Sequence, residues 1–182
     1  GYWGIWDEKF LDYMGEVLSQ QKEPFFSTMF TLTSHHPFVV PEEYEGVYPK
    51  GHTPNHQCVG YVDDAFRKFF AKYENEEWFR NTVFVFVADH VSSEKMTETF
   101  RRSPGDYHTF GFMYAPESAL VGEHRQVVSQ IDIMPTLLGL MGHSEPYFAF
   151  GRDIFNEHVD EPFAINYDNN AFTPVKCYNG DK

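Results

Sequence analysis

The chain has 182 residues, of which 42% are hydrophobic and 18% aromatic, so it carries enough bulky side chains for a core and is not a disordered chain. Its formal charge of −13 comes from 27 acidic and 14 basic residues, which argues against broad nucleic-acid binding because an acidic surface repels phosphate. No apolar run approaches the roughly 18 residues that a membrane-spanning helix needs. The two cysteines, Cys58 and Cys177, are expected to be buried thiols, with a single disulfide bridge as the alternative.

The first third of the chain alternates a helical pattern with an extended one. Asp7 is expected to cap a helix whose apolar side chains recur at helical spacing as far as Leu18. Residues 25–32 (FFSTMFTL) predict a strand, and residues 33–37 (TSHHP) predict the loop at its carboxyl end. Residues 41–57 are rich in proline and glycine and predict a long irregular loop.

The middle of the chain contains the best candidate for a buried strand. Aromatic and small residues at helical spacing predict a helix over residues 61–73. Residues 83–88 (VFVFVA) form an unbroken run that is typical of a central strand covered on both faces. Residues 109–114 predict the next strand, and the alternation of strands with helices indicates an α/β architecture.

The last third predicts one helix and one short strand. Asp132 is expected to cap the helix, which has Pro135 in its first turn, where proline costs little, and Gly142 at its end. A further strand is expected near residues 163–166.

Asp89 and His90 directly follow the predicted central strand. Ligands of open α/β sheets bind at the carboxyl ends of the strands, so a carboxylate and an imidazole placed there can reach one divalent ion. Their oxygen and nitrogen donors suit zinc or manganese. The alternative is an aspartate that caps the next turn beside a surface histidine, and spacing alone favours this plainer interpretation.

Other polar residues leave similar alternatives open. His35 and His36 also follow a predicted strand and can bind phosphate, transfer a proton or ligate a metal, or be a solvated pair in a loop. His108 precedes a strand and is therefore expected at the opposite edge of the sheet. Arg101 and Arg102 can contact an anionic substrate, but charged pairs in loops are usually only solvated.

Seven short segments occur in a fixed order along nearly the whole chain. They are residues 3–8 (WGIWDE), 24–26 (PFF) leading to 31–38 (TLTSHHPF), 61–65 (YVDDA), 81–90 (NTVFVFVADH), 114–116 (YAP), 129–138 (SQIDIMPTLL) and 150–153 (FGRD). In this order they resemble the C-terminal part of the lipoteichoic acid synthase-like phosphoglycerol transferases, in the sulfatase branch of the alkaline phosphatase superfamily.

The resemblance implies an α/β fold with an alkaline phosphatase/sulfatase-like mixed sheet flanked by helices. Residues 1–182 would form the C-terminal part of a sulfatase-like catalytic domain, so the sheet is expected to be incomplete on its N-terminal side. The parent protein would be anchored in the bacterial cell membrane with this domain on the extracytoplasmic face, and the fragment itself would be soluble. A sheet edge exposed in this way invites self-association of the fragment.

The resemblance also implies a set of site residues. Asp89 and His90 would hold a divalent metal, with manganese as the first choice and zinc or magnesium as alternatives, and His35 would meet the substrate phosphate. The family's early carboxylate ligand and its threonine nucleophile lie before the matched segments, so both are expected outside this chain and the fragment alone is expected to be inactive. Val91 stands where the family usually has glycine.

The implied function of the intact parent is phosphoglycerol transfer from a phosphatidylglycerol-like lipid headgroup. One alternative is a hydrolase of the sulfatase or phosphodiesterase type, although the Cys-x-Pro-x-Arg signature of true sulfatases is absent. The other alternative is a non-catalytic module of the same fold. Nucleic acid is not expected as a partner.

Overall fold

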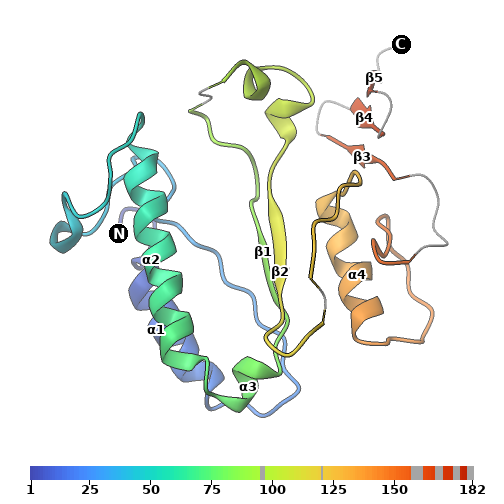
Figure 1. Cartoon of the computed structure of the whole chain (residues 1–182), viewed down its shortest axis with the longest axis horizontal. Helices are drawn as coiled ribbons and strands as arrows, with labels where there is room; N and C mark the ends of the chain where they lie inside the picture. The colour runs from blue at the N-terminus through green and yellow to red at the C-terminus, as the bar shows by residue number, and fades with distance from the viewer. Residues whose placement is uncertain (95–96, 120, 157–161, 167–169, 174–176, 180–182) are drawn as a thin grey trace. The chain divides into compact units, whose positions relative to one another are not determined.

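A computed structural model describes residues 1–94, 97–119, 121–156, 162–166, 170–173 and 177–179 (Figure 1). The chain divides into two compact units, each of which is described by itself. The first comprises Gly1–Val85 and Met113–Leu120, and the second comprises Phe86–Phe112 and Val121–Lys182.

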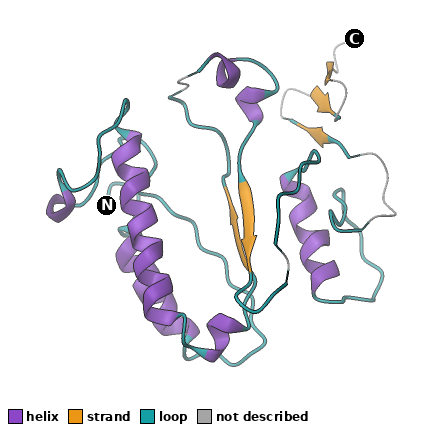
Figure 2. Cartoon of the chain, in the orientation of Figure 1, coloured by secondary structure: helices purple, strands orange, loops and turns teal. Residues whose placement is uncertain are grey.

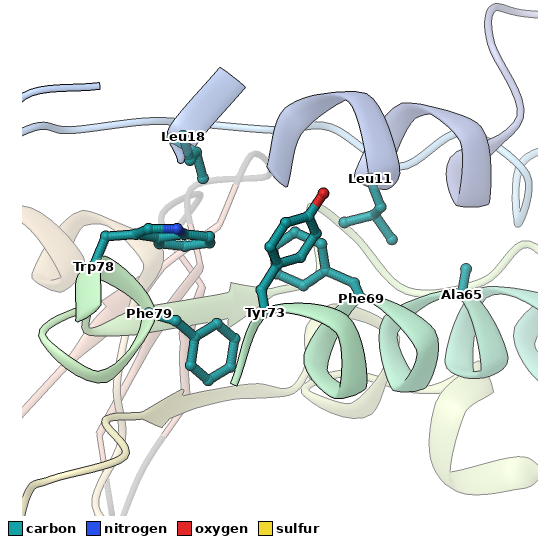
Figure 3. Packing of buried hydrophobic residues seen from close by; sticks show 7 residues of the cluster. All are labelled: Leu11, Leu18, Ala65, Phe69, Tyr73, Trp78 and Phe79. Atoms are coloured by element: carbon teal, nitrogen blue, oxygen red, sulfur yellow. The ribbon is translucent and has the colours of Figure 1, made fainter. Parts of the chain in front are cut away.

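The first unit is built on two helices that pack against each other, α1 (Asp7–Leu18) and α2 (Asn55–Tyr73), followed by the short helix α3 (Glu77–Arg80) (Figure 1). Both long helices were expected from their spacing of apolar residues, but α2 begins earlier than expected, at Asn55, with Pro54 in the N-cap position. Side chains from all three helices meet in one core (Figure 3). Its buried members are Leu11, Leu18, Ala65, Phe69, Tyr73, Trp78 and Phe79.

Residues 25–32 form a loop, so the predicted strand is wrong (Figure 2). Phe25 and Met29 pack against the core of the first unit, whereas Phe26 and Phe30 are exposed. Within the described residues no strand pairs with this segment. An apolar run supplies side chains for one buried face, but a strand also needs a hydrogen-bonded neighbour.

The strands β1 (Phe84–Val87) and β2 (Gly111–Tyr114) pair as a two-stranded sheet. They run in opposite directions (Figure 1). Both strands fall inside the predicted ranges. The predicted coverage of β1 on both faces is wrong, however, because Val87 is exposed and β2 is its single partner among the described strands.

The second unit contains α4 (Ile133–Leu140), which continues a 3₁₀ helix, Gln130–Asp132. The N-cap of this combined helix is Ser129 and not Asp132, because Ser129 and Asp132 form a capping box. Gly142, with a φ of 69°, lies just past the helix end as predicted.

Short elements complete the described structure. Three 3₁₀ helices lie in loops: Glu42–Tyr44, Glu98–Arg101 and Gly105–Tyr107. A second sheet has the antiparallel order β3-β4-β5, formed by Ala164–Ile165, Asn170–Phe172 and Cys177–Asn179. β3 lies in the range where the sequence predicts a strand. None of the helices in the described ranges is long and apolar enough to cross a membrane.

Candidate functional site

Asp89 and His90 lie immediately beyond the end of β1, and both side chains are exposed, by 55% and 70%. Nδ1 of His90 is 2.7 Å from the Val91 carbonyl oxygen. Because a carbonyl only accepts, Nδ1 carries the proton and Nε2 presents its lone pair. Nε2 lies 3.5 Å from Oδ2 of Asp89, so the two potential ligand atoms lie next to each other.

The backbone N–H of His90 also donates to Oδ1 of Asp89 at 2.9 Å. The plainer interpretation, an aspartate that caps the following turn, is therefore fulfilled by one carboxylate oxygen. The second oxygen still faces the imidazole. One carboxylate oxygen of Asp89 is thus bound by the backbone, and the other remains available as a potential ligand.

His35 lies in the loop that residues 33–37 predict, and it is exposed. Its Nδ1 is 2.9 Å from the His36 carbonyl oxygen, which leaves Nε2 as the outward nitrogen, as in His90. The indole of Trp3 packs edge-on against the His35 ring with 4.7 Å between centroids, and its N–H donates to the same carbonyl. His35 is therefore held on two sides, while the His36 ring contacts Phe38 instead.

Asp7 anchors the His35 loop and does not cap α1, so that expectation is wrong. Its buried carboxylate accepts the N–H groups of Leu32 and Thr33, each at 2.9 Å, and Thr33 Oγ1 accepts the Asp7 N–H at 3.4 Å. The N-cap position belongs to Trp6. A buried carboxylate needs such partners, and here they come from 25 residues further along the chain.

His108 lies at the same end of the two-stranded sheet as Asp89 and His90, and the predicted opposite edge is wrong. Because β1 and β2 run in opposite directions, the start of β2 lies beside the end of β1. The Ala88 N–H accordingly donates to the Phe110 carbonyl at 3.2 Å. Strand direction is a property of the pairing and leaves no signal in the sequence of one strand.

The other polar candidates have local partners. Arg101 and Arg102 each lie 3.3 Å from the carboxylate of Glu98, and all three side chains are exposed. This agrees with the solvated interpretation. Cys58 is buried as expected, whereas the side chain of Cys177 lies outside the described residues.

The structure brings Asp89 and His90 together within the second unit, whereas His35 belongs to the first unit. That these three side chains share one site stays a prediction. Among the described residues no group of three or more His, Cys, Asp or Glu side chains is arranged to hold a metal ion. Asp89 and His90 can supply two ligands of such an ion.

Comparison with known proteins places these residues in a family context. The family model described as Sulfatase matches residues 1–143. Lipoteichoic acid synthase 1 of Bacillus subtilis is 28% identical over 179 residues, which cover 89% of this chain and 28% of that protein. Lipoteichoic acid synthase of Staphylococcus aureus is 26% identical over 171 residues, or 85% of this chain and 26% of that protein.

The fold is also found in a solved structure, a protein of the alkaline phosphatase superfamily from Vibrio parahaemolyticus. It superimposes with a TM-score of 0.81 at 26% identity, covering all of this chain and 46% of that one. This confirms the expected α/β fold of the alkaline phosphatase and sulfatase type. The chain spans about a quarter of the length of the curated relatives, and it belongs to the sulfatase family.

Proposed function

We propose that the protein is a metal-dependent phosphoglycerol transferase that acts on phosphatidylglycerol-like lipids. The observation that carries the proposal is the pair of donor atoms, His90 Nε2 and Asp89 Oδ2, which lie 3.5 Å apart just beyond β1. Support for the substrate class comes from the relatives, which are named lipoteichoic acid synthases. The residues 1–182 would then form the C-terminal part of the catalytic domain.

The donor pair fits a divalent metal. Two ligand atoms of one ion with bonds of about 2.1 Å lie roughly 3–3.4 Å apart, depending on the angle, which is close to the separation seen here. The fixed proton on Nδ1 of His90 is the arrangement usual for a metal-bound histidine, whose other nitrogen donates to a carbonyl. We take manganese as the first choice, with zinc or magnesium as alternatives.

The chemistry assigns separate roles to the chain's own residues. Asp89 and His90 would hold the ion, which supplies positive charge to neutralise the phosphate oxygens. With a second proton on Nε2, His35 would donate a hydrogen bond to the phosphate, or pass that proton to the diacylglycerol oxygen as the phosphorus–oxygen bond breaks. An acidic surface is compatible with this, because the attraction for phosphate is local to the ion.

The nucleophile would be a threonine outside these 182 residues, together with a further carboxylate ligand. Thr33 is a poor candidate because its side chain is buried and Oγ1 accepts the Asp7 N–H. Thr28 is exposed and lies on a loop. The 182 residues alone would therefore be inactive, and they would be able to self-associate.

The substrate class also implies a location. Phosphatidylglycerol-like lipids are reached at the membrane surface, and we propose the extracytoplasmic face of a bacterial cell membrane, with the protein anchored there. No nucleic acid is proposed as a partner.

The test is an assay of the full-length gene product with phosphatidylglycerol labelled in its glycerol headgroup. Asp89→Asn and His90→Gln should each lower kcat/KM by more than about 100-fold, and His35→Gln by about 10- to 100-fold. His143→Gln, a change at an exposed histidine in the second unit, serves as the matched control and should leave the rate unchanged. Undiminished turnover by Asp89→Asn would contradict the proposal.

The Sulfatase family match favours one competing function, hydrolysis. Release of free phosphoglycerol without transfer to any acceptor hydroxyl would support a phosphodiesterase, and turnover of a sulfate ester would support a sulfatase. A complete lack of turnover in the full-length gene product would support a non-catalytic module.

A further inference from the structure

We infer that Gln130 is a positioning residue, which holds the backbone around Asp89 in the orientation that a bound metal requires. Its side-chain amide donates to two carbonyl oxygens, that of Ala88 at 2.7 Å and that of Asp89 at 2.9 Å. Both partners only accept, so the amide nitrogen must face them, and its two hydrogens match the two carbonyls one to one. All of these atoms lie in the second unit.

The two carbonyls flank a single Cα atom. The Ala88 carbonyl belongs to the peptide plane before Asp89, and the Asp89 carbonyl belongs to the plane after it. Because each peptide unit is planar, a hydrogen bond to each carbonyl restrains both planes and so restrains both backbone dihedrals of Asp89. The second plane also leads directly into His90, so the directions of both donor side chains depend on it.

Among the described residues no group other than Gln130 binds either carbonyl oxygen, although the His90 N–H of the second plane also donates to Asp89 Oδ1. The Ala88 N–H is bound to Phe110, just past the end of β1, but no described backbone N–H donates to the carbonyl of Ala88 or of Asp89. Asp89 and His90 are mostly exposed, so packing does not hold them. The Gln130 amide is therefore the contact that holds the backbone of Asp89 in place beyond the end of β1.

Gln130 is itself placed by a rigid support. Asp132 accepts the Ser129 N–H at 2.8 Å and the Arg152 N–H at 2.9 Å, one on each carboxylate oxygen. Asp132 is buried, so these bonds are protected from water. They fix the helical turn on which Gln130 stands, and the turn directs the amide at Ala88 and Asp89.

This inference rests on the proposed metal role of Asp89 and His90, and the experiment separates the two. Mn²⁺ binding is measured on the full-length protein from the loss of the free-ion electron paramagnetic resonance signal. Asp89→Asn identifies the share of binding that belongs to this site. The melting temperature without metal is recorded for every variant.

Gln130→Met keeps the length of the side chain and removes its donors, and it should weaken Mn²⁺ binding roughly tenfold. Gln130→Asn keeps the amide but is too short to reach both carbonyls, and it should give a smaller loss. The matched control is Gln57→Met, which removes an amide bond to the Phe38 carbonyl in the first unit and should leave Mn²⁺ affinity unchanged. Because Gln130 is exposed, its variants should melt within about two degrees of the wild type.

The outcomes are distinct. Wild-type affinity in Gln130→Met, with Asp89→Asn defective, would overturn the positioning role and leave the proposed function intact. Equal Mn²⁺ binding by wild type and Asp89→Asn would overturn the metal site and the positioning role together. If Gln130→Met weakens Mn²⁺ binding but also lowers the metal-free melting temperature by clearly more than about two degrees, its role is purely structural. That result would also overturn the inference.

Discussion

The two units of the molecule are stabilised in different ways. In the first unit the buried side chains are mainly aromatic and aliphatic and belong to three helices. In the described part of the second unit the buried residues are Gly105, Asp132, Pro135 and Thr136, and none of them is a large apolar residue. The donor pair therefore lies in a unit whose described interior is organised by hydrogen bonds, which fix directions more strictly than apolar packing does.

The largest expected effect tests the apolar side of this comparison. Phe79 lies in the first unit and is 1% exposed. Replacing it by alanine should lower the free energy of unfolding by about 3–5 kcal/mol. Phe110→Ala in the second unit is the matched control, because that ring is 67% exposed and should cost less than about 0.5 kcal/mol. Urea denaturation measures the free energy of unfolding of both variants. Similar losses in Phe79→Ala and Phe110→Ala would contradict the contrast between the two units. Phe79→Leu is the milder variant if Phe79→Ala does not fold.

The next effect concerns the polar anchor of the His35 loop in the first unit. Asp7→Ala should cost about 2–3 kcal/mol, because it leaves the N–H groups of Leu32 and Thr33 without their acceptor. Asp12→Ala on the same helix removes an exposed ion pair with Lys72 and should cost less than about 1 kcal/mol. Denaturation together with amide hydrogen exchange at Thr33 distinguishes them. Unchanged exchange in Asp7→Ala would disprove the anchoring role.

A smaller effect is expected inside the second unit. The Thr136 hydroxyl donates to the Asp132 carbonyl at 2.6 Å and accepts the Ile154 N–H at 3.1 Å. Thr136→Val keeps the shape, loses both bonds and should cost about 1–2 kcal/mol. Thr97→Val, at an exposed position of the same unit, should be neutral in the same denaturation experiment. A neutral Thr136→Val would show that polar contacts do not stabilise this unit.

The smallest effect depends on pH. Partial burial alone would raise the pKa of Asp64, but hydrogen bonds from Arg67, Tyr48 and Lys68 outweigh it and lower the pKa to about 2. A depressed pKa contributes stability above the unfolded value near 3.8, and this stability is lost as the pH falls towards 2.

The corresponding variant is Asp64→Asn. With a side chain 21% exposed, the contribution of Asp64 should be about 1 kcal/mol at pH 6, fading between about pH 4 and pH 2. Unfolding free energies of wild type and Asp64→Asn should converge over that range, and the neighbouring exposed Asp63→Asn should show no such trend. A difference that does not depend on pH would contradict this account of Asp64.

The sequence predicted the elements of the first unit better than their connections. The spacing of apolar residues in α1 and α2 predicted both helices, because one buried face suffices to define a helix. The run at residues 25–32 did not predict its own structure, since a strand depends on a partner elsewhere in the chain. For the same reason the position of His108 depended on the direction of pairing between β1 and β2.

The sequence suggested which residues form the candidate site, and that assignment stays a prediction, but the sequence did not indicate their geometry. The order of motifs pointed to Asp89, His90 and His35. The protonated nitrogen of each histidine could not be predicted, because it depends on a carbonyl oxygen that the local backbone presents. The contact of Gln130 with Ala88 and Asp89 joins segments about 40 residues apart, and neither segment carries a signal of the other.

Asp89 and His90 are proposed to bind one divalent ion. The most direct measurement is an anomalous difference map from crystals of the protein grown with Mn²⁺. The account predicts a peak about 2.1–2.3 Å from both Asp89 Oδ2 and His90 Nε2, which is lost in Asp89→Asn. A well-ordered Mn²⁺ bound elsewhere, with these two side chains turned away from each other, would contradict it.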